Sequence, residues 1–221
     1  MLHANAVKPK TRKAQATRQR QLDVAEVLFA KKGYFDTSIV DITQAANVAL
    51  GTFYLYFPSK LAIFQELVRQ LNRSLRSHLG EAVAGITNRA EIERAGFQAF
   101  FVFVDRRRNL YSIVSQAELV DPELYRWYYR SLAESYTRGL KLAARRREAR
   151  KLDAETISWC LMGMAHFIGM RWVLWEDKAL PKLQFESLFE FIRGGMLTVE
   201  RQSEVPAGKA VGGKIVKRRK P

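Results

Sequence analysis

Residues 48–60 form a short segment with the side chains whose types and spacing best suit binding to an extended partner. It reads V-A-L-G-T-F-Y-L-Y-F-P-S-K, so small residues and a glycine precede a run of aromatic residues. A glycine lets a helix approach another backbone closely, and a threonine presents a hydroxyl and a methyl group together. Tyrosine hydroxyls and a lysine ammonium can bind phosphates. The segment therefore predicts a short helix that enters the major groove of DNA.

Catalytic and metal-binding chemistry finds weaker support in the sequence. His166 lies four residues from both Met162 and Met170, which places one imidazole and two thioethers on one helix face. Such a set is a poor soft-metal site, so we interpret His166 as a core or pocket histidine. We find no glycine-rich phosphate loop and no persuasive grouping of His, Cys and carboxylates. We expect no enzymatic activity, no metal and no cofactor.

A preceding helix and a tight corner must position this segment. Residues 39–46 are predicted to form that helix, with Thr37 or Ser38 as its N-cap. Asn47 tolerates the left-handed conformation that the corner demands. Two short helices joined in this way, with basic flanks, predict a helix-turn-helix.

The helices before and after this predicted helix-turn-helix complete its small apolar core. Apolar residues between 22 and 29 form one face of a first helix, and Gly33 ends that helix. Pro58 ends the proposed reading helix, and Ser59 opens a fourth helix that runs to about residue 80. The hydrophobic spacing of three and four continues through the rest of the chain, which predicts an all-α protein.

With these elements in place, residues 16–62 resemble the DNA-binding domain of the TetR family of bacterial repressors. The spacing, the glycine, the aromatic residues and the closing F-P-S-K agree together. The resemblance implies an N-terminal three-helix DNA-binding domain and a larger C-terminal helical domain that binds a ligand and dimerises. The boundaries that we predict are a basic flexible arm at 1–14, the helix-turn-helix domain at 15–58, a connecting helix at 59–80, the ligand-binding and dimerisation domain at 81–202, and a disordered basic tail at 203–221.

The predicted DNA contacts divide into base readers and phosphate binders. The readers are Ala49, Leu50 and Thr52, and Gly51 allows the close approach. The phosphate binders are Tyr54 and Tyr56, for which the resemblance implies this role, together with Lys60 and with Thr37 or Ser38 at the start of the preceding helix.

Two positions depart from the family pattern. Leu50 lies where many relatives carry a polar or basic residue, and Asn47 replaces the usual glycine. Leu50 should favour apolar contact over a hydrogen bond, so a relative's operator sequence does not transfer to this chain.

The charge of the chain is concentrated at its two ends. The formal net charge is +15, of which residues 1–20 carry +6 and residues 201–221 carry +6. Basic ends on a nearly neutral body indicate a polyanionic partner. The N-terminal arm either follows DNA or is a solvated leader, and both alternatives stay open. We interpret the C-terminal run as a solubilising tail more readily than as a specific DNA contact.

Cysteine content and hydropathy indicate the compartment. Cys160 is the single cysteine, which excludes an intramolecular disulfide and fits a reducing cytoplasm. The N-terminus is polar and basic, and Arg, His or Asp interrupts the apolar stretches before bilayer length. We expect a cytoplasmic, nucleoid-associated protein with no membrane partner.

The resemblance implies a homodimer formed by the last two long helices of each subunit. The sequence supports it independently, because the last helix carries an apolar stripe with little chain left to cover it. The predicted interface residues are Ile157, Met164, Ile168, Phe185, Leu188, Phe189, Ile192, Met196 and Val199.

Aromatic residues and methionines of the larger domain predict an adaptable apolar pocket. The predicted lining residues are Phe100, Phe103, Arg106, Arg107, Tyr111, Tyr125, Tyr128, Trp159, Met162, His166 and Met170. Arginines at 106–108 and Arg171 could receive an anionic head. An acyl-CoA or fatty acid, another apolar or aromatic compound, and no ligand at all stay open as alternatives.

Together these features predict a homodimeric transcriptional regulator. We expect a repressor that a small apolar or amphipathic effector releases from a palindromic operator in double-stranded DNA. The alternative is a DNA-binding architectural or cell-division factor that has no small-molecule ligand.

Overall fold

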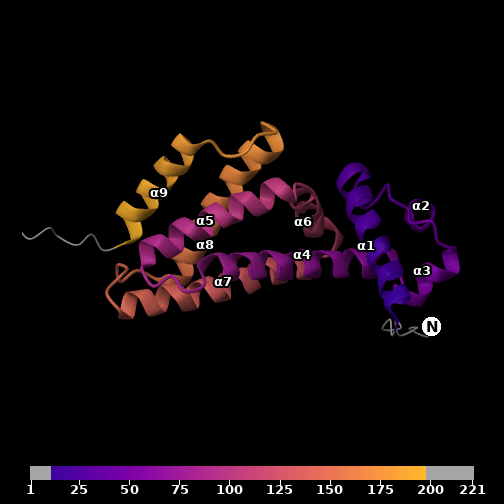
Figure 1. The fold of residues 1–221 in the computed structure, drawn as a ribbon, viewed down its shortest axis with the longest axis horizontal. Coiled ribbons are helices and arrows are strands. Elements are labelled where there is room, and N and C mark those ends of the chain that lie inside the picture. Colours follow the sequence, from indigo (N-terminus) through magenta and orange to yellow (C-terminus); the bar gives the residue numbers. More distant parts are fainter. Residues whose placement is uncertain (1–10, 198–221) are drawn as a thin grey trace, which may run out of the picture.

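The computed structural model describes residues 11–197, except for the side chains of Leu110 and Tyr111, and this part of the chain is helical. Figure 1 shows a small head at one end, an elongated body at the other, and one long helix that runs from the head into the body. The predicted all-α fold is confirmed. The elements are α1 (Arg12–Lys32), α2 (Ile39–Ala45), α3 (Leu50–Tyr56), α4 (Lys60–Val83), α5 (Arg89–Arg106), α6 (Asn109–Val120), α7 (Pro122–Arg145), α8 (Ala154–Gly169) with a π-helical continuation (Met170–Trp175), and α9 (Lys182–Met196).

The head consists of α1, α2 and α3, and local signals set its helix ends. Gly33 ends α1 with φ of 86°, and its N–H donates to the carbonyl of Phe29. Ser38 begins α2 in a capping box with Asp41. Asn47 forms the corner before α3 with φ of 50°, so the predicted left-handed conformation is confirmed.

Helix α4 joins the head to the body through one continuous apolar core. Ser59 caps α4 by accepting a hydrogen bond from the N–H of Ala62. The core begins with Phe29 and Phe53 in the head, continues along α4 through Phe64, and reaches Ile113 in α6. A displacement of α4 or α6 therefore alters the packing of side chains in the head.

A second apolar core lies in the part of the body farthest from the head, where α9 packs against α5 and α8. Arg94 on α5 binds Glu186 on α9 through two hydrogen bonds of 2.8 and 2.7 Å. The guanidinium of Arg94 also lies 4.2 Å from the ring centroid of Phe189. These contacts fix the C-terminal helix on its own subunit.

This packing corrects the predicted dimer interface. The apolar stripe of α9 is buried inside the subunit, because α5 and α8 cover it. Its described members are Phe185, Leu188, Phe189, Ile192 and Met196. Ile157, Met164 and Ile168 of α8 are partly buried against the same core, and Val199 lies outside the described residues.

The helix boundaries also differ from the predicted ones. Helix α1 begins at Arg12, so residues 12–14 are helical rather than part of a flexible arm. Its N-cap is Thr11, whose hydroxyl accepts from the N–H of Ala14. Helix α4 continues past residue 80 to Val83, and α9 begins at Lys182. The rest of the predicted arm and the whole predicted tail lie outside the described residues.

Candidate nucleic-acid interface and effector cavity

Helix α3 divides sharply into a buried side and an exposed side. Phe53 is fully buried and fixes the helix on the head. Leu50, Gly51 and Tyr54 are exposed, as is Leu55, which the sequence analysis did not single out. At 3.6 residues per turn these four positions share one face, which is the surface that α3 offers to a groove.

The proposed base readers lie at or beside this face. Ala49 is exposed and precedes the first turn as N-cap, with no side-chain cap hydrogen bond. Thr52 is half-buried at the edge of the face. A Cβ added at Gly51 would meet no atom within 4 Å, so packing inside the protein does not require a glycine there. The space in front of Gly51 is open to an external partner.

Ser38 begins α2, the helix that packs against α3 in the head. The Ser38 hydroxyl accepts from the N–H of Asp41 at 3.0 Å, and the carboxylate of Asp41 accepts from the N–H of Ser38 at 2.7 Å. Hydrogen bonds from Ser38, followed by the nearby Lys32 ammonium, lower the pKa of Asp41 to about 2. Ser38 is exposed at this end, as its proposed phosphate role requires.

The structure places Thr37 and Lys60 elsewhere than predicted. Thr37 is fully buried, and its hydroxyl donates to the carbonyl of Gly33 at 2.7 Å. The ammonium of Lys60 donates to the carbonyls of Tyr34 and Thr37 at 2.8 Å each, and to that of Phe35 at 3.3 Å. All three donors of Lys60 are therefore used inside the protein. Both residues fasten the turn before α2 to its neighbours.

The two tyrosines of α3 differ in exposure. Tyr54 is exposed, and its ring meets that of Phe53 edge-on. Tyr56 is half-buried and packs on the core of the head. Tyr54 is therefore freer than Tyr56 to present its hydroxyl to a phosphate.

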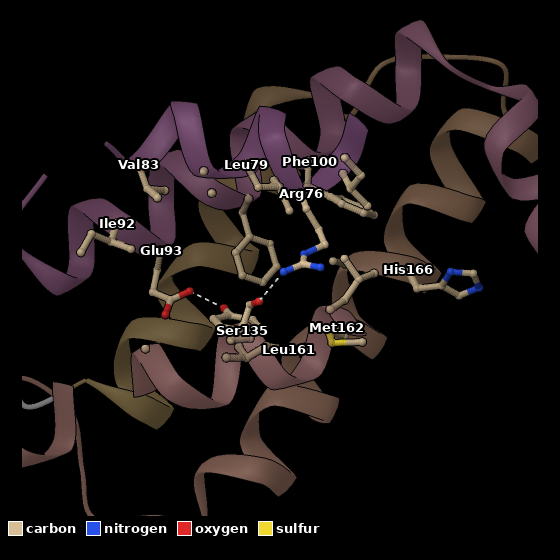
Figure 2. Close-up of a pocket in the computed structure, with 18 of the residues that line it drawn as sticks. Arg76, Leu79, Val83, Ile92, Glu93, Phe100, Ser135, Leu161, Met162 and His166 are labelled. Atoms are coloured by element: carbon tan, nitrogen blue, oxygen red, sulfur yellow. Dashed lines mark hydrogen bonds between the residues drawn. The ribbon is translucent and has the colours of Figure 1, made fainter. Parts of the chain in front are cut away.

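The body contains a cavity of about 680 Å³, which is in the size range of small-molecule sites. Helices α4, α5, α6, α7 and α8 all contribute to its wall. Figure 2 shows apolar side chains around it, with Val83 and Ile92 at one end and Phe100 and Met162 toward the other. The space is shaped for an apolar or partly apolar compound.

Four of the predicted pocket residues line this cavity, namely Phe100, Tyr128, Met162 and His166. Phe103, Tyr125 and Met170 belong instead to the core that continues into the head. Trp159 and Arg106 are exposed, Arg107 pairs with Glu26 of α1 at 2.8 Å, and the side chain of Tyr111 lies outside the described part. Helical spacing shows which residues share a face, but it does not show which face meets the cavity.

The polar residues of the cavity wall were not predicted from the sequence. Arg89 and Glu93, one turn apart on α5, form a buried ion pair, and the hydroxyl of Tyr136 on α7 donates to Glu93. Burial, with the nearby Glu93 carboxylate second, raises the pKa of Tyr136 well above its usual value, so this hydroxyl stays protonated. The i, i+4 spacing of Arg89 and Glu93 was the available signal, although it is common on exposed helices.

Arg73, Arg76 and Ser135 also line the cavity, and because all three are exposed to solvent, the cavity opens beside them. Figure 2 shows Arg76 reaching from α4 toward Ser135 of α7, with a hydrogen bond of 3.2 Å between them. His166 lies at the edge, and its ring points away from the other labelled side chains in Figure 2. Burial lowers the pKa of His166, so its imidazole is neutral at pH 7.

No group of three or more His, Cys, Asp or Glu side chains that could hold a metal occurs within residues 11–197. Within the described residues, the structure offers an exposed face of α3 and a mostly apolar cavity. A head of three helices with Asn47 at the corner and an exposed α3 defines a helix-turn-helix DNA-binding protein.

Comparisons with known proteins identify the family. Residues 22–67 match the model of bacterial regulatory proteins of the tetR family. The chain is 29% identical over 190 residues to the uncharacterized transcriptional regulator YdgC of Bacillus subtilis, covering 82% of this chain and 94% of that protein. It is 36% identical to the repressor KstR2 of Rhodococcus jostii over 77 residues, which are 34% of this chain and 38% of KstR2.

Solved structures share the fold. The structure of GusR from Salmonella enterica superposes with a TM-score of 0.71 at 21% identity, covering 85% of this chain and 98% of GusR. The chain belongs to the TetR family of bacterial transcriptional regulators.

Proposed function

We propose that the protein is a homodimeric repressor that binds a palindromic operator through α3 and is released when a ligand occupies the cavity. The observation that carries the proposal is the double role of α4. This helix lines the cavity with Leu75, Leu79 and Val83, and its first residue, Lys60, holds the turn before α2. A ligand that favours a different position of α4 changes the position of the head.

Helix α6 supplies a second connection between the cavity and the head. Val114 of α6 lines the cavity, and Gln116 lies two residues further along the same helix. The side-chain oxygen of Gln116 accepts from the N–H of Tyr34 at 2.6 Å, and its amide nitrogen donates to the carbonyl of Phe29 at 2.9 Å. Gln116 thus joins α6 to the end of α1, so ligand contact at Val114 and the position of the head are coupled.

The surface that supports a dimer is the outer face of α8 and α9. Phe167 is 64% exposed, Leu183 73% and Phe191 68%. By length and composition alone, the helical span Ala154–Trp175 could cross a membrane, although it carries Arg171 within its last turns. We assign the exposed apolar face of this span to a second copy of the chain, because two-fold operators require paired heads.

Light scattering on matched variants tests the dimer. Leu183→Glu should convert the dimer to monomers at micromolar concentration, because it buries a charge in an apolar interface. Leu119→Glu is the control, since Leu119 is equally exposed, at 78%, but lies on α6. A wild-type protein that is monomeric, or equal behaviour of the two variants, contradicts this interface.

Selection of DNA from a random library, followed by fluorescence anisotropy, tests the repressor proposal. We expect a palindromic sequence to be enriched, and a cavity ligand to lower its affinity by about 5- to 150-fold, which is the usual range of allosteric coupling. Binding without sequence preference, together with no compound that stabilises the protein in thermal-shift screens, favours the architectural alternative.

A further inference from the structure

Two arginines, Arg76 of the cavity wall and the exposed Arg138 of α7, converge on the hydroxyl oxygen of Ser135, which also lines the cavity. Arg76 of α4 donates to the Ser135 hydroxyl at 3.2 Å, and Arg138 of α7 donates to the same oxygen at 3.1 Å. Two guanidinium groups repel each other, and a hydroxyl oxygen does not neutralise them. Neither arginine has a carboxylate partner among residues 11–197. The pair is therefore an uncompensated positive centre at the entrance.

Four other arginines that lie near the cavity or were considered as anion binders are already paired with carboxylates. Arg73 lies 3.0 Å from Glu66, Arg107 lies 2.8 Å from Glu26, and Arg108 lies 2.8 Å from Asp105. Inside the cavity, Arg89 is paired with Glu93. Arg76 and Arg138 thus differ from these arginines in having charge available for a ligand.

The interior of the cavity favours a particular orientation of a charged ligand. Glu93 is 2% exposed, and its carboxylate already accepts from Arg89 and Tyr136. A ligand anion placed beside Glu93 would meet a like charge in a poorly solvated site. The rest of the wall, including Leu79, Val83 and Phe100, is apolar. An anionic head is therefore favoured at the opening, with the apolar body inside.

We infer that Arg76, Arg138 and Ser135 form an anion subsite at the cavity opening, and that the ligand is an anionic amphiphile with a carboxylate or phosphate head. A planar guanidinium binds both kinds of head through paired hydrogen bonds. That this ligand releases the protein from the operator rests on the proposed function, whereas the subsite concerns only how the ligand binds.

Isothermal titration of the full-length protein with probes of equal chain length tests the subsite. The anionic probes are dodecanoate, dodecyl phosphate and dodecanoyl-coenzyme A, and the comparators are dodecanol and dodecyltrimethylammonium, all below their aggregation concentrations. Arg76→Gln and Arg138→Gln should each lower the affinity for the anionic probes about tenfold. The double variant should lower this affinity about a hundredfold. Each methylene removed from dodecyl phosphate should weaken binding roughly fourfold.

The control variant is Arg126→Gln, which removes an arginine on the same helix, α7, that is paired with Glu123. We expect wild-type affinities from Arg126→Gln, and unchanged dodecanol binding in all variants. If dodecanol binds as tightly as the anions, or if Arg126→Gln loses as much affinity as Arg76→Gln, the subsite is overturned. The probe that binds most tightly distinguishes a fatty acid, a lipid phosphate and an acyl thioester as the source of the head.

Operator release is measured separately, so that the two proposals can fail independently. If the anionic probes bind in the expected order but do not release DNA, the subsite stands and the effector step of the proposed function fails. If none of these amphiphiles binds but another compound releases the operator, the proposed function stands and the subsite is wrong.

Discussion

The head and the body use buried space in opposite ways. In the head, the interior is filled with apolar side chains such as Phe29, Ile42 and Phe53, and the side chains proposed for function lie outside. In the body, the interior is left partly open, and an ion pair with a tyrosine lies in the cavity wall. The head can therefore lose its proposed contacts without losing stability, whereas in the body the cavity wall serves binding and stability together.

Phe53→Ala should give the largest loss of stability in the head. Phe53 is fully buried, so its truncation removes apolar contacts and leaves a cavity, at a cost of about 3–5 kcal/mol. Urea denaturation measures the loss. The matched change is Tyr54→Ala on the next, exposed residue, which should alter the free energy of unfolding by no more than about 0.5 kcal/mol. Similar losses from both variants would mean that the buried and exposed sides of α3 do not differ in their contribution to stability.

Arg89→Met tests the body in the same way. The change leaves the carboxylate of Glu93 buried without its positive partner, which costs about 3–5 kcal/mol in typical buried pairs. The double variant Arg89→Met with Glu93→Leu should recover most of this loss, because it removes both charges. If the double variant is no more stable than the single one, the packing around Arg89, rather than its charge pairing with Glu93, stabilises the cavity wall.

Ser38→Ala should have a smaller effect and a defined pH dependence. Loss of this N-cap costs about 0.5–2 kcal/mol at neutral pH. The pKa of Asp41 is lowered from 3.8 to about 2 by its hydrogen bonds to Ser38 and Lys32. The stability that Asp41 contributes is therefore complete above pH 3.8 and is lost as the pH falls toward 2. Denaturation across this range should show a weaker acid dependence for Ser38→Ala, and equal slopes would contradict the capping box.

The same contrast explains how far the sequence could predict the structure. The head follows from local signals, since Gly33, Asn47 and Ser59 each act within a few residues of their own position. The cavity does not, because five helices meet around it and helical periodicity cannot say which faces meet. The predicted dimer stripe on α9 was wrong for a related reason. An apolar stripe shows that something covers it, and in this protein α5 and α8 do so.

Lys60 and Arg76 show the same limit for single residues. Sequence position favoured Lys60 as a phosphate binder, but three carbonyls accept its hydrogen bonds. No sequence pattern singles out Arg76 on α4, and only the approach of α7 brings it to Ser135 and Arg138. The role of a charged side chain depends on partners that are distant in the sequence.

Gly51→Ala gives the smallest change in stability and the clearest separation of stability from binding. The added Cβ meets no atom within 4 Å, and alanine is the better helix former, so unfolding should cost up to about 1 kcal/mol more than in the wild type. Affinity for the selected operator should nevertheless fall, because the methyl group occupies the space through which α3 approaches DNA. Anisotropy with operator and random duplexes measures the effect, and Gly80→Ala is the control, since its Cβ also meets no atom and Gly80 lies on α4. A stabilised Gly51→Ala protein that retains full operator affinity would show that α3 does not approach DNA through this face.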